Sequence, residues 1–252
     1  MNEPEIQRVA LVTGGAVRLG RALSLGLARA GYDVAVHFGT SSEAAREVDG
    51  RIQELGRRCT TIQANLADPG AATVLADSVR DAFGRLDLLV NSAATFDAHP
   101  LDGVDAALWD RIMAVNVRAP HLLVRAATDL LAAAEGSVVN VVDLSAFQAW
   151  AEHPVHAVSK AALTHLTRVQ ARALAPRVRV NAVAPGAVLP PDDYPAERLD
   201  ALRTRTPLLT LGRPDDVVEA VLYLAGAGFV TGQVLAVDGG RLLGPAGPSP
   251  TN

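Results

Sequence analysis

Several features that mark particular classes of protein are scarce or absent in these 252 residues. A single cysteine, Cys59, excludes an internal disulfide framework and fits a reducing compartment. No apolar run reaches the ~18 residues that indicate a membrane span. With a net charge of −4 at pH 7, the chain has no basic surplus for nucleic acid or an acidic membrane face. Its start, MNEPEIQRVALV, lacks a basic n-region, so we expect no signal peptide and a cytoplasmic protein.

What the chain does contain is a regular alternation of short apolar runs with longer amphipathic stretches. It is 49% hydrophobic and long enough for one large α/β domain. Buried parallel strands read as continuous apolar runs, and the stretches between them read as covering helices. The predicted strands are 9–12, 34–38, 60–63, 86–90, 137–142, 178–183 and 234–237, and the predicted helices lie near 19–30, 42–55, 70–83, 105–132, 155–174 and 214–225. We therefore expect a single Rossmann-type domain over 1–243, a doubly wound parallel sheet of about seven strands with helices on both faces.

Two segments interrupt this alternation. Segment 185–212 holds five prolines and is too long for a simple connection. Loops of this size usually act as lids or binding loops, so we predict a substrate loop over about 186–212. An ordinary surface excursion is the alternative. The C-terminal segment 244–252 is rich in proline and glycine, and we expect it to be a flexible tail.

A glycine-rich turn follows the first predicted strand directly, in the run Thr13-Gly14-Gly15-Ala16-Val17-Arg18-Leu19-Gly20. Such a turn lets the backbone approach a pyrophosphate, which then lies at the positive end of the next helix. Glycines alone are a weak signal, but their position between the first strand and a helix predicts a dinucleotide site. A tight turn without a ligand is the alternative.

The end of the second strand indicates which dinucleotide binds. NAD-preferring sites usually place an acid here, on the ribose 2′-hydroxyl. The run His37-Phe38-Gly39-Thr40-Ser41-Ser42 has no acid, and it offers hydroxyls, a histidine and a helix N-terminus that tolerate a 2′-phosphate. Arg18 adds a positive charge facing the phosphates. We therefore predict NADP(H) as the cofactor.

Ordered motifs along 8–243 resemble those of the short-chain dehydrogenase/reductase family. They are the loop TGGAVRLG, the strand end LVNSAA (89–94), Asn116 in MAVNV, HAVSKAAL (156–163), RVNAVAPG (179–186) and FVTGQVLAVDGG (229–240). The resemblance implies a small-molecule substrate and Lys160 on the nicotinamide ribose. It also implies a homotetramer built on the helices near 105–132 and 155–174 and on the last strand.

Within that family the chain is most similar to the pteridine reductases and dihydromonapterin reductases. The shared features are Arg18 in the glycine loop, Asp143 at the end of the fifth strand, and Phe96 after the fourth strand. The resemblance implies that Phe96 stacks on a pterin ring. The run Asp192-Asp193-Tyr194-Pro195 resembles the substrate loop of that subgroup, and DGGRLL (238–243) resembles its C-terminal ending. Tyr194 could reach the substrate.

The chain also departs from the family pattern. His156 stands where the catalytic tyrosine would stand, four residues before Lys160. Asn65 replaces the aspartate that contacts adenine, and Ser92 replaces the second residue of a double asparagine. A threonine that is usual after the Pro-Gly turn is absent, since Ala187 follows Pro185 and Gly186.

The motifs and the resemblance together assign roles to three sets of residues. The cofactor set is Thr13, Gly14, Arg18, Leu19, Gly20, His37, Thr40, Ser41, Asn65, Leu66, Asn91, Ser92, Ala93, Lys160, Pro185 and Gly186. The catalytic set is Asp143, His156, Lys160 and Asn116, and the substrate set is Arg18, Phe96, Asp143, His156 and Tyr194.

His156, Lys160 and Asp143 form the chemical centre of the prediction. His156 and Lys160 share one helix face, and Asp143 ends a strand at the edge where ligands bind. An imidazolium can act as a general acid, because an ordinary imidazole pKa of about 6.5 suits neutral pH better than a tyrosine pKa near 10. Lys160 disfavours the charged imidazolium and Asp143 favours it, so the balance is open at this point. Reduction of a C=N bond favours this arrangement, since an imine nitrogen is more basic than a carbonyl oxygen and asks less of the acid.

We therefore predict an NADPH-dependent reductase of a dihydropterin or a related cyclic imine. A short-chain reductase of another carbonyl or imine is one alternative. A non-catalytic NADP(H)-binding sensor is another, because His156 removes the direct signal for chemistry. A metal site at His153, His156 and Asp143 lacks further ligands at a recognisable spacing, so we predict no metal. Phe96 has the alternative role of a core aromatic.

Overall fold

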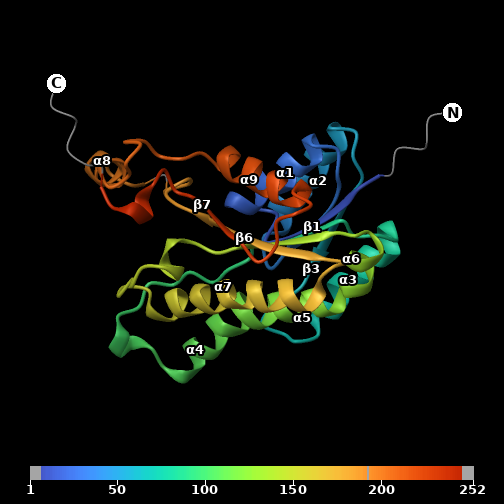
Figure 1. Ribbon diagram of the computed structural model, residues 1–252, viewed down its shortest axis with the longest axis horizontal. Helices are drawn as coiled ribbons and strands as arrows, with labels where there is room; N and C mark the ends of the chain where they lie inside the picture. The colour runs from blue at the N-terminus through green and yellow to red at the C-terminus, as the bar shows by residue number, and fades with distance from the viewer. Residues whose placement is uncertain (1–6, 192, 246–252) are drawn as a thin grey trace.

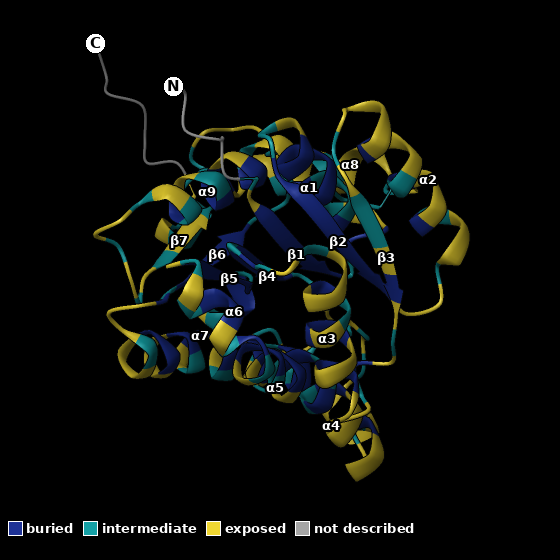
Figure 2. Cartoon of the chain, turned by 90° about the vertical axis from the view of Figure 1, so that its right-hand side faces the viewer, coloured by how far each residue is buried: buried dark blue, intermediate teal, exposed yellow. Residues whose placement is uncertain are grey.

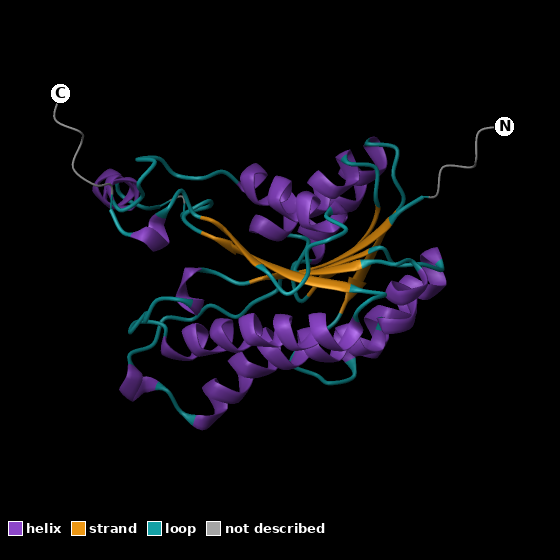
Figure 3. Ribbon diagram, in the orientation of Figure 1, coloured by secondary structure: helices purple, strands orange, loops and turns teal. Residues whose placement is uncertain are grey.

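A seven-stranded parallel sheet runs through the middle of the protein and separates two layers of helices (Figures 1 and 3). The computed structural model describes residues 7–191 and 193–245. The strands are β1 (Val9–Thr13), β2 (Asp33–Phe38), β3 (Cys59–Gln63), β4 (Leu88–Asn91), β5 (Ser137–Val141), β6 (Arg179–Pro185) and β7 (Val234–Val237). Their order is β3-β2-β1-β4-β5-β6-β7, and each neighbouring pair is parallel. The predicted doubly wound sheet is confirmed.

Helices cover both faces of this sheet, with α1, α2 and α9 on one side and α3 to α7 on the other (Figure 1). The helices are α1 (Arg18–Arg29), α2 (Ser42–Glu54), α3 (Ala71–Phe83), α4 (Ala106–Met113), α5 (Ala119–Ala126), α6 (Thr128–Ala133), α7 (Pro154–Leu174), α8 (Ala196–Thr204) and α9 (Pro214–Gly226). One apolar core packs Leu23 of α1 and Val218 of α9 against the face of the sheet that α1, α2 and α9 cover. A second packs Leu75 of α3 and Leu123 of α5 against the other face.

Burial explains why the strands were readable as apolar runs. Every residue of β1, β2, β4 and β5 is buried, whereas the outer strands β3 and β7 are partly exposed (Figure 2). A strand covered on both faces reads as a nearly continuous apolar run rather than as an alternation of apolar and polar residues. The predicted strand ends consequently agree with the observed ones to within two residues.

The strand order places a ligand crevice between β1 and β4. Thr13 and Asn91 are register partners at the carboxyl ends of these two strands. From there the chain continues to α1 on one face of the sheet and toward α4 on the other. Connections that diverge in this way leave an opening at the carboxyl edge, which is where ligands bind in doubly wound sheets.

Two predicted segments differ in detail. The helix predicted near 105–132 is interrupted by a π-helical turn, Ala114–Arg118, between α4 and α5, and by Ala127 before α6. The predicted loop 186–212 contains a helix, α8, whose residues carry no buried face that an apolar pattern could reveal. Asp192 and residues 246–252 of the predicted tail lie outside the described residues. Among the helices of 7–191 and 193–245, none is long and apolar enough to span a membrane.

The contact between α1 and α9 gives a prediction about stability. A Cβ added to Gly26 of α1 would lie 2.4 Å from a methyl carbon of Val218 in α9. Because valine has little freedom to turn away, we expect Gly26→Ala to destabilise the protein by roughly 1–3 kcal/mol. The matched control is Gly50→Ala in α2, where an added Cβ meets nothing within 4 Å. There the better helix propensity of alanine should stabilise by about 0.5–1 kcal/mol. Urea midpoints measure both, and equal midpoints for the two variants would contradict the prediction.

Candidate active site

One large cavity opens at the carboxyl edge of the sheet. Its volume is about 1480 Å³, whereas sites for a single small ligand commonly measure ~300–1,000 Å³. The predicted cofactor residues that line it are Gly14, Arg18, Leu19, Gly20, His37, Thr40, Asn65, Leu66, Ser92, Ala93, Lys160, Pro185 and Gly186. The predicted catalytic and substrate residues Phe96, Asp143, His156 and Tyr194 line it too. The cavity therefore has room for a dinucleotide and a second molecule.

The glycine turn at one end of the cavity has the shape that a pyrophosphate needs. Gly14 has a φ of +63°, in the left-handed region that favours glycine. A Cβ on Gly20 would lie 2.0 Å from the carbonyl oxygen of Gly14, so only glycine lets α1 begin this close to the turn. The N-terminus of α1 then faces the cavity with its backbone amides and positive dipole end. These residues fit a dinucleotide phosphate.

His37 holds this turn in place rather than offering a charge to the cofactor. Its Nδ1 accepts a hydrogen bond from the Gly14 amide at 3.1 Å, and its Nε2 lies 3.1 Å from the carbonyl oxygen of Ala64. A nitrogen that accepts from an amide carries no proton, so the ring is neutral with its proton on Nε2. Burial lowers the pKa of His37, against the opposing bond to Ala64. A charge-assisted contact from His37 to a 2′-phosphate is therefore incompatible with this structure, and the polar side chains of Thr40, Gln63 and Asn65 line the cavity at this end.

Three predicted cofactor residues lie behind the cavity wall. Thr13 Oγ1 accepts hydrogen bonds from the amides of Ser92 and Ala93, at 3.0 and 3.1 Å, and so ties the end of β4 to β1. Asn91 is buried and donates to Asn140 Oδ1 at 2.8 Å. Ser41 precedes α2 and is likewise absent from the lining residues. Thr13 and Asn91 shape the wall instead of touching its contents.

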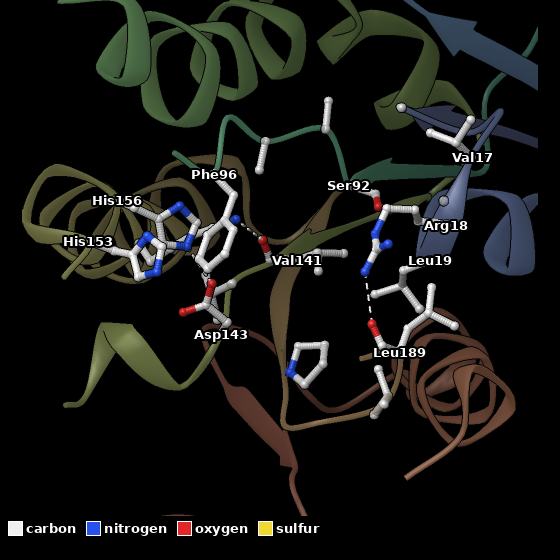
Figure 4. A pocket seen from close by; sticks show the side chains of 18 of the residues that line it. Val17, Arg18, Leu19, Ser92, Phe96, Val141, Asp143, His153, His156 and Leu189 are labelled. Carbon is white, nitrogen blue, oxygen red and sulfur yellow. Dashed lines mark hydrogen bonds and ion pairs between the residues drawn. The ribbon is translucent and has the colours of Figure 1, made fainter. Parts of the chain in front are cut away.

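Arg18 spans the cavity from the glycine turn to the opposite wall. Its backbone is left-handed, with φ +49°, and its Nη2 donates to the carbonyl oxygen of Leu189 at 2.8 Å (Figure 4). Leu189 belongs to the segment that follows β6. The predicted substrate loop is thus fastened to the predicted cofactor loop by a single side chain.

His156 and Asp143 form a hydrogen-bonded pair on the far side of the cavity (Figure 4). His156 Nε2 lies 2.6 Å from Asp143 Oδ2, and His156 Nδ1 lies 3.1 Å from the carbonyl oxygen of Thr95. A carbonyl oxygen can only accept, so Nδ1 must carry a proton. One further proton must lie between Nε2 and the carboxylate, because two bare acceptors would repel each other. The pair therefore holds two protons and is neutral overall.

Asp143 is the member of this pair that is open to the cavity. Its side chain is 22% exposed, whereas that of His156 is 2% exposed. Its other oxygen, Oδ1, accepts from the amide and the hydroxyl of Ser145. Burial raises the pKa of Asp143, but hydrogen bonds from His156 and Ser145 and the positive charge of Lys160 outweigh burial and leave that pKa below its ordinary value. Both nitrogens of His156 are occupied, so a proton can pass from His156 to the cavity only through Asp143.

Lys160 lies one helical turn after His156 and is buried at the floor of the cavity. Its Nζ donates to the carbonyl oxygen of Val141 at 2.8 Å. Burial lowers the pKa of Lys160, and the Asp143 carboxylate opposes that effect. Since the direct partner of His156 is Asp143 and that of Lys160 is a carbonyl, the geometry favours the protonated pair over repulsion between Lys160 and the imidazolium.

Asn116 supports the pair without lining the cavity. It lies in the π-helical turn and is fully buried. Its Oδ1 accepts from the Thr95 amide at 2.8 Å, while its Nδ2 donates to the Thr95 carbonyl at 3.1 Å and to Ser159 Oγ at 2.9 Å. Asn116 therefore fixes the carbonyl that receives the Nδ1 proton of His156.

Phe96 lies over the two histidines at the cavity wall (Figure 4). Its ring stacks on His153 with centroids 4.2 Å apart and meets His156 edge-on at 4.7 Å. The side chain is 54% exposed, so Phe96 is a lining residue and not a core aromatic. His153 Nδ1 lies 3.1 Å from the backbone carbonyl oxygen of Asp97, within hydrogen-bonding distance. Within 7–191 and 193–245, no group of three His, Cys, Asp or Glu side chains has the geometry to hold a metal.

The structure adds cavity residues that sequence reasoning missed. Tyr194 lines the cavity as predicted, and Arg198 lies over its ring at 4.0 Å. The missed residues include Trp150, Arg198, Arg205 and Arg241. The arginines come from α8, the segment after it and the turn after β7. No spacing in the sequence relates these positions, so only the fold brings them together.

The buried, neutral His37 gives a pH prediction for the ligand-free protein. Because the pKa of His37 is lower in the folded chain, the unfolded chain binds more protons below about pH 6.5. We therefore expect full stability above that pH and a loss as pH falls toward the folded pKa. Urea unfolding at several pH values should show a smaller loss for His37→Gln than for the wild type. The exposed His121 supplies the control His121→Gln, which should behave as the wild type. An unchanged loss in His37→Gln would contradict the assignment.

Comparison with known proteins identifies the family. The sequence profile of a family described as Enoyl-(Acyl carrier protein) reductase matches residues 15–241. The chain is 34% identical over 255 residues to the short-chain dehydrogenase/reductase FrzI of a Cladobotryum species, covering 95% of this chain and 98% of FrzI. FolM Alternative dihydrofolate reductase 1 from Brucella suis, solved in complex with NADP, is 34% identical with a TM-score of 0.88 over 96% of this chain and 97% of that chain.

A second solved structure is a blue fluorescent protein from a metagenomic library in complex with NADPH. It is 35% identical with a TM-score of 0.86, over 93% of this chain and 97% of that one. Both solved neighbours share the seven-stranded architecture described above. By profile, identity and fold, the chain belongs to the short-chain dehydrogenase/reductase family of oxidoreductases.

Proposed function

We propose that this protein is an NADPH-dependent reductase of a dihydropterin or a related cyclic imine. The observation that carries the proposal is the Asp143–His156 pair, which holds one shared proton with its carboxylate side open to the cavity. At the position where the family resemblance puts a tyrosine the chain has His156, and the donor that we assign is the proton shared by His156 and Asp143, which reaches the cavity through the carboxylate.

The cofactor is NADP(H), a prediction confirmed by the two solved neighbours, which hold NADP and NADPH. The residues that would hold it are the glycine turn at its phosphates, Thr40 and Asn65 at the adenosine end, and Lys160 at the nicotinamide ribose. When bound, NADPH supplies the hydride that reduces the substrate carbon.

The Asp143–His156 pair suits a C=N substrate better than a ketone. Asp143 Oδ2 would deliver the proton to the substrate nitrogen, and His156 Nε2 would return a proton to Asp143. In the family, protonation of a developing alkoxide is the task of the tyrosine, and this chain has no phenol at that position. An imine nitrogen needs no such donor, since it is itself basic. Phe96, half exposed beside the pair, would stack on the flat ring. The printed name of the Brucella neighbour, a dihydrofolate reductase, supports this substrate class.

A second candidate is an NADP(H)-binding protein without turnover. It is favoured by the absence of the phenol at position 156 and by the solved neighbour in complex with NADPH that is named a blue fluorescent protein rather than an enzyme. A protein of this kind would bind NADPH tightly and reduce no pterin, imine or ketone.

Assembly as a homotetramer also stays a proposal. It is supported by the exposed Val158 and Val169 on α7 and by the outer strand β7, and light scattering of the purified protein tests it.

The experiment that tests the proposed function follows NADPH absorbance in the presence of dihydrobiopterin, a cyclic imine and a ketone. We expect turnover of the dihydropterin, with a rate that falls as pH rises and the Asp143–His156 pair loses its shared proton. Tight NADPH binding without turnover of any of the three compounds would establish the second candidate instead.

Replacing the acid itself gives a sharper prediction. Asp143→Asn keeps the size of the side chain and its contact with Ser145, but it removes the carboxylate through which the shared proton passes. We expect kcat for the dihydropterin to fall by about 10²–10⁴-fold, with the Kd for NADPH unchanged. Asp102→Asn, an exposed aspartate in the 3₁₀ turn Leu101–Gly103, is the control. Full activity in Asp143→Asn would overturn the proton path.

The role of His156 is tested by two substitutions at the same position. His156→Ala should lower kcat and flatten the pH dependence, because Asp143 loses the group that returns its proton. His156→Tyr should lower dihydropterin reduction and raise ketone reduction, because it restores the phenol. If His156→Ala keeps both the rate and the pH profile, the histidine takes no part in proton transfer.

A further inference from the structure

The cavity is lined by more basic than acidic side chains. Five basic side chains line the cavity as a whole, Arg18, Lys160, Arg198, Arg205 and Arg241, against the two acids Asp143 and Glu152. The whole chain, by contrast, has a net charge of −4. Three of these arginines, Arg198, Arg205 and Arg241, come from the segment 198–205 and from the turn after β7. Positive charge is therefore concentrated in this cavity.

The packing of two turns brings Arg205 and Arg241 together. Arg205 precedes Thr206 and Pro207, and Arg241 follows Gly239 and Gly240. Leu208 donates its amide proton to the Gly239 carbonyl at 3.2 Å. Both glycines have positive φ, and added Cβ atoms would lie 2.4 Å from Thr206 and 3.0 Å from Pro207. This close contact holds the two guanidinium-bearing segments against each other.

Neither guanidinium is neutralised by an ion pair within 7–191 and 193–245. Other arginines of the same region do have partners there: Arg203 pairs with Asp200, and Arg213 with Asp216. The nearest acid to Arg241, Asp238, directs its two carboxylate oxygens to the amides of Gly240 and Leu242. Burial lowers the pKa of Arg241, the charge of Arg205 lowers that pKa further, and Asp238 opposes both effects. An anion between the two arginines would relieve this repulsion.

We infer that Arg205 and Arg241 form an anion-binding subsite for an acidic substituent of the substrate, a carboxylate or a phosphate. The inference rests on the proposed function for the identity of the ring that carries this group. Arg198, which lies over Tyr194, extends the same positive surface toward the cavity. The preferred substrate is thus a dihydropterin with an anionic tail rather than a neutral one.

Arg205 and Arg241 lie apart from the residues expected to bind the cofactor phosphates. The 2′-phosphate end of the cavity is marked by Thr40 and Asn65, which follow β2 and β3. Arg241 follows β7, at the opposite edge of the sheet. The pyrophosphate end is the glycine turn after β1. An anion held by Arg205 and Arg241 therefore belongs to the second molecule in the cavity.

The kinetic test compares one neutral and two anionic substrates. Dihydrobiopterin is neutral, dihydrofolate carries carboxylates, and the phosphate ester of dihydroneopterin carries a phosphate. We expect kcat/KM of the wild type to favour at least one anionic substrate over dihydrobiopterin by about tenfold or more, a preference that added salt reduces. The variant Arg205→Gln/Arg241→Gln should lose that preference while keeping its rate with dihydrobiopterin. Whether the carboxylate or the phosphate substrate loses more identifies the natural anion.

The matched control is Arg203→Gln, which removes the same charge from the same segment but from an arginine that is paired with Asp200 and does not line the cavity. It should leave the preference intact. Equal kcat/KM for the neutral and the anionic substrates in the wild type would overturn the inference. An equal loss of the preference in the control and in the double variant would also overturn it, because a long-range charge effect would then explain the result.

A binding measurement separates this inference from the proposed function. Calorimetry of the NADPH-loaded protein with p-aminobenzoylglutamate, which has the carboxylates and no pterin ring, needs no turnover. We expect binding that weakens by about tenfold in the double variant and is unchanged in Arg203→Gln. If no dihydropterin is reduced but this fragment binds in that pattern, the proposed reaction fails and the subsite stands. If the fragment and the phosphate ester bind the double variant and the wild type equally, the subsite does not exist.

Discussion

The hydrogen bond between His156 Nε2 and Asp143 Oδ2 is the interaction on which the chemistry of this protein depends. It is stable only with a proton between the two atoms, because His156 Nδ1 is already committed to the Thr95 carbonyl. With a histidine at this position, the residue of the pair that faces the cavity is Asp143. The carboxyl group becomes the outer member and the imidazole the inner one. Asn116, held in a π-helical turn, keeps the receiving carbonyl in position.

The fold was predictable from the sequence for a simple physical reason. Strands such as β1 and β5 are buried on both faces, so their sequences are mostly apolar and stand out from the helices between them. The glycine turn was also predictable, because Gly14 and Gly20 are needed wherever a helix starts this close to a strand end. What could not be predicted were features that no local pattern encodes. The π-helical turn has the same composition as the helices beside it, and α8 has no buried face.

The site was predictable only where one segment carries the signal. The spacing of His156 and Lys160 and the strand-end position of Asp143 placed all three in the cavity correctly. The role of His37 could not be inferred, because its partners Gly14 and Ala64 are on other elements and its neutrality follows from both bonds together. The adjacency of Arg205 and Arg241 depends on how two turns pack. Charge at such sites is a property of the fold rather than of the sequence.

The bond from Arg18 to the Leu189 carbonyl has a consequence for how ligands act on each other. One side chain closes the gap between the loop that receives phosphates and the loop that borders the substrate. A phosphate that draws the guanidinium toward the glycine turn releases Leu189, and a substrate that reorganises the Leu189 loop alters the same guanidinium. Linkage then requires that each ligand change the affinity for the other by an equal factor. Ligands that compete for this guanidinium in that way would couple the two halves of the cavity, and the left-handed backbone of Arg18 fixes where its side chain starts.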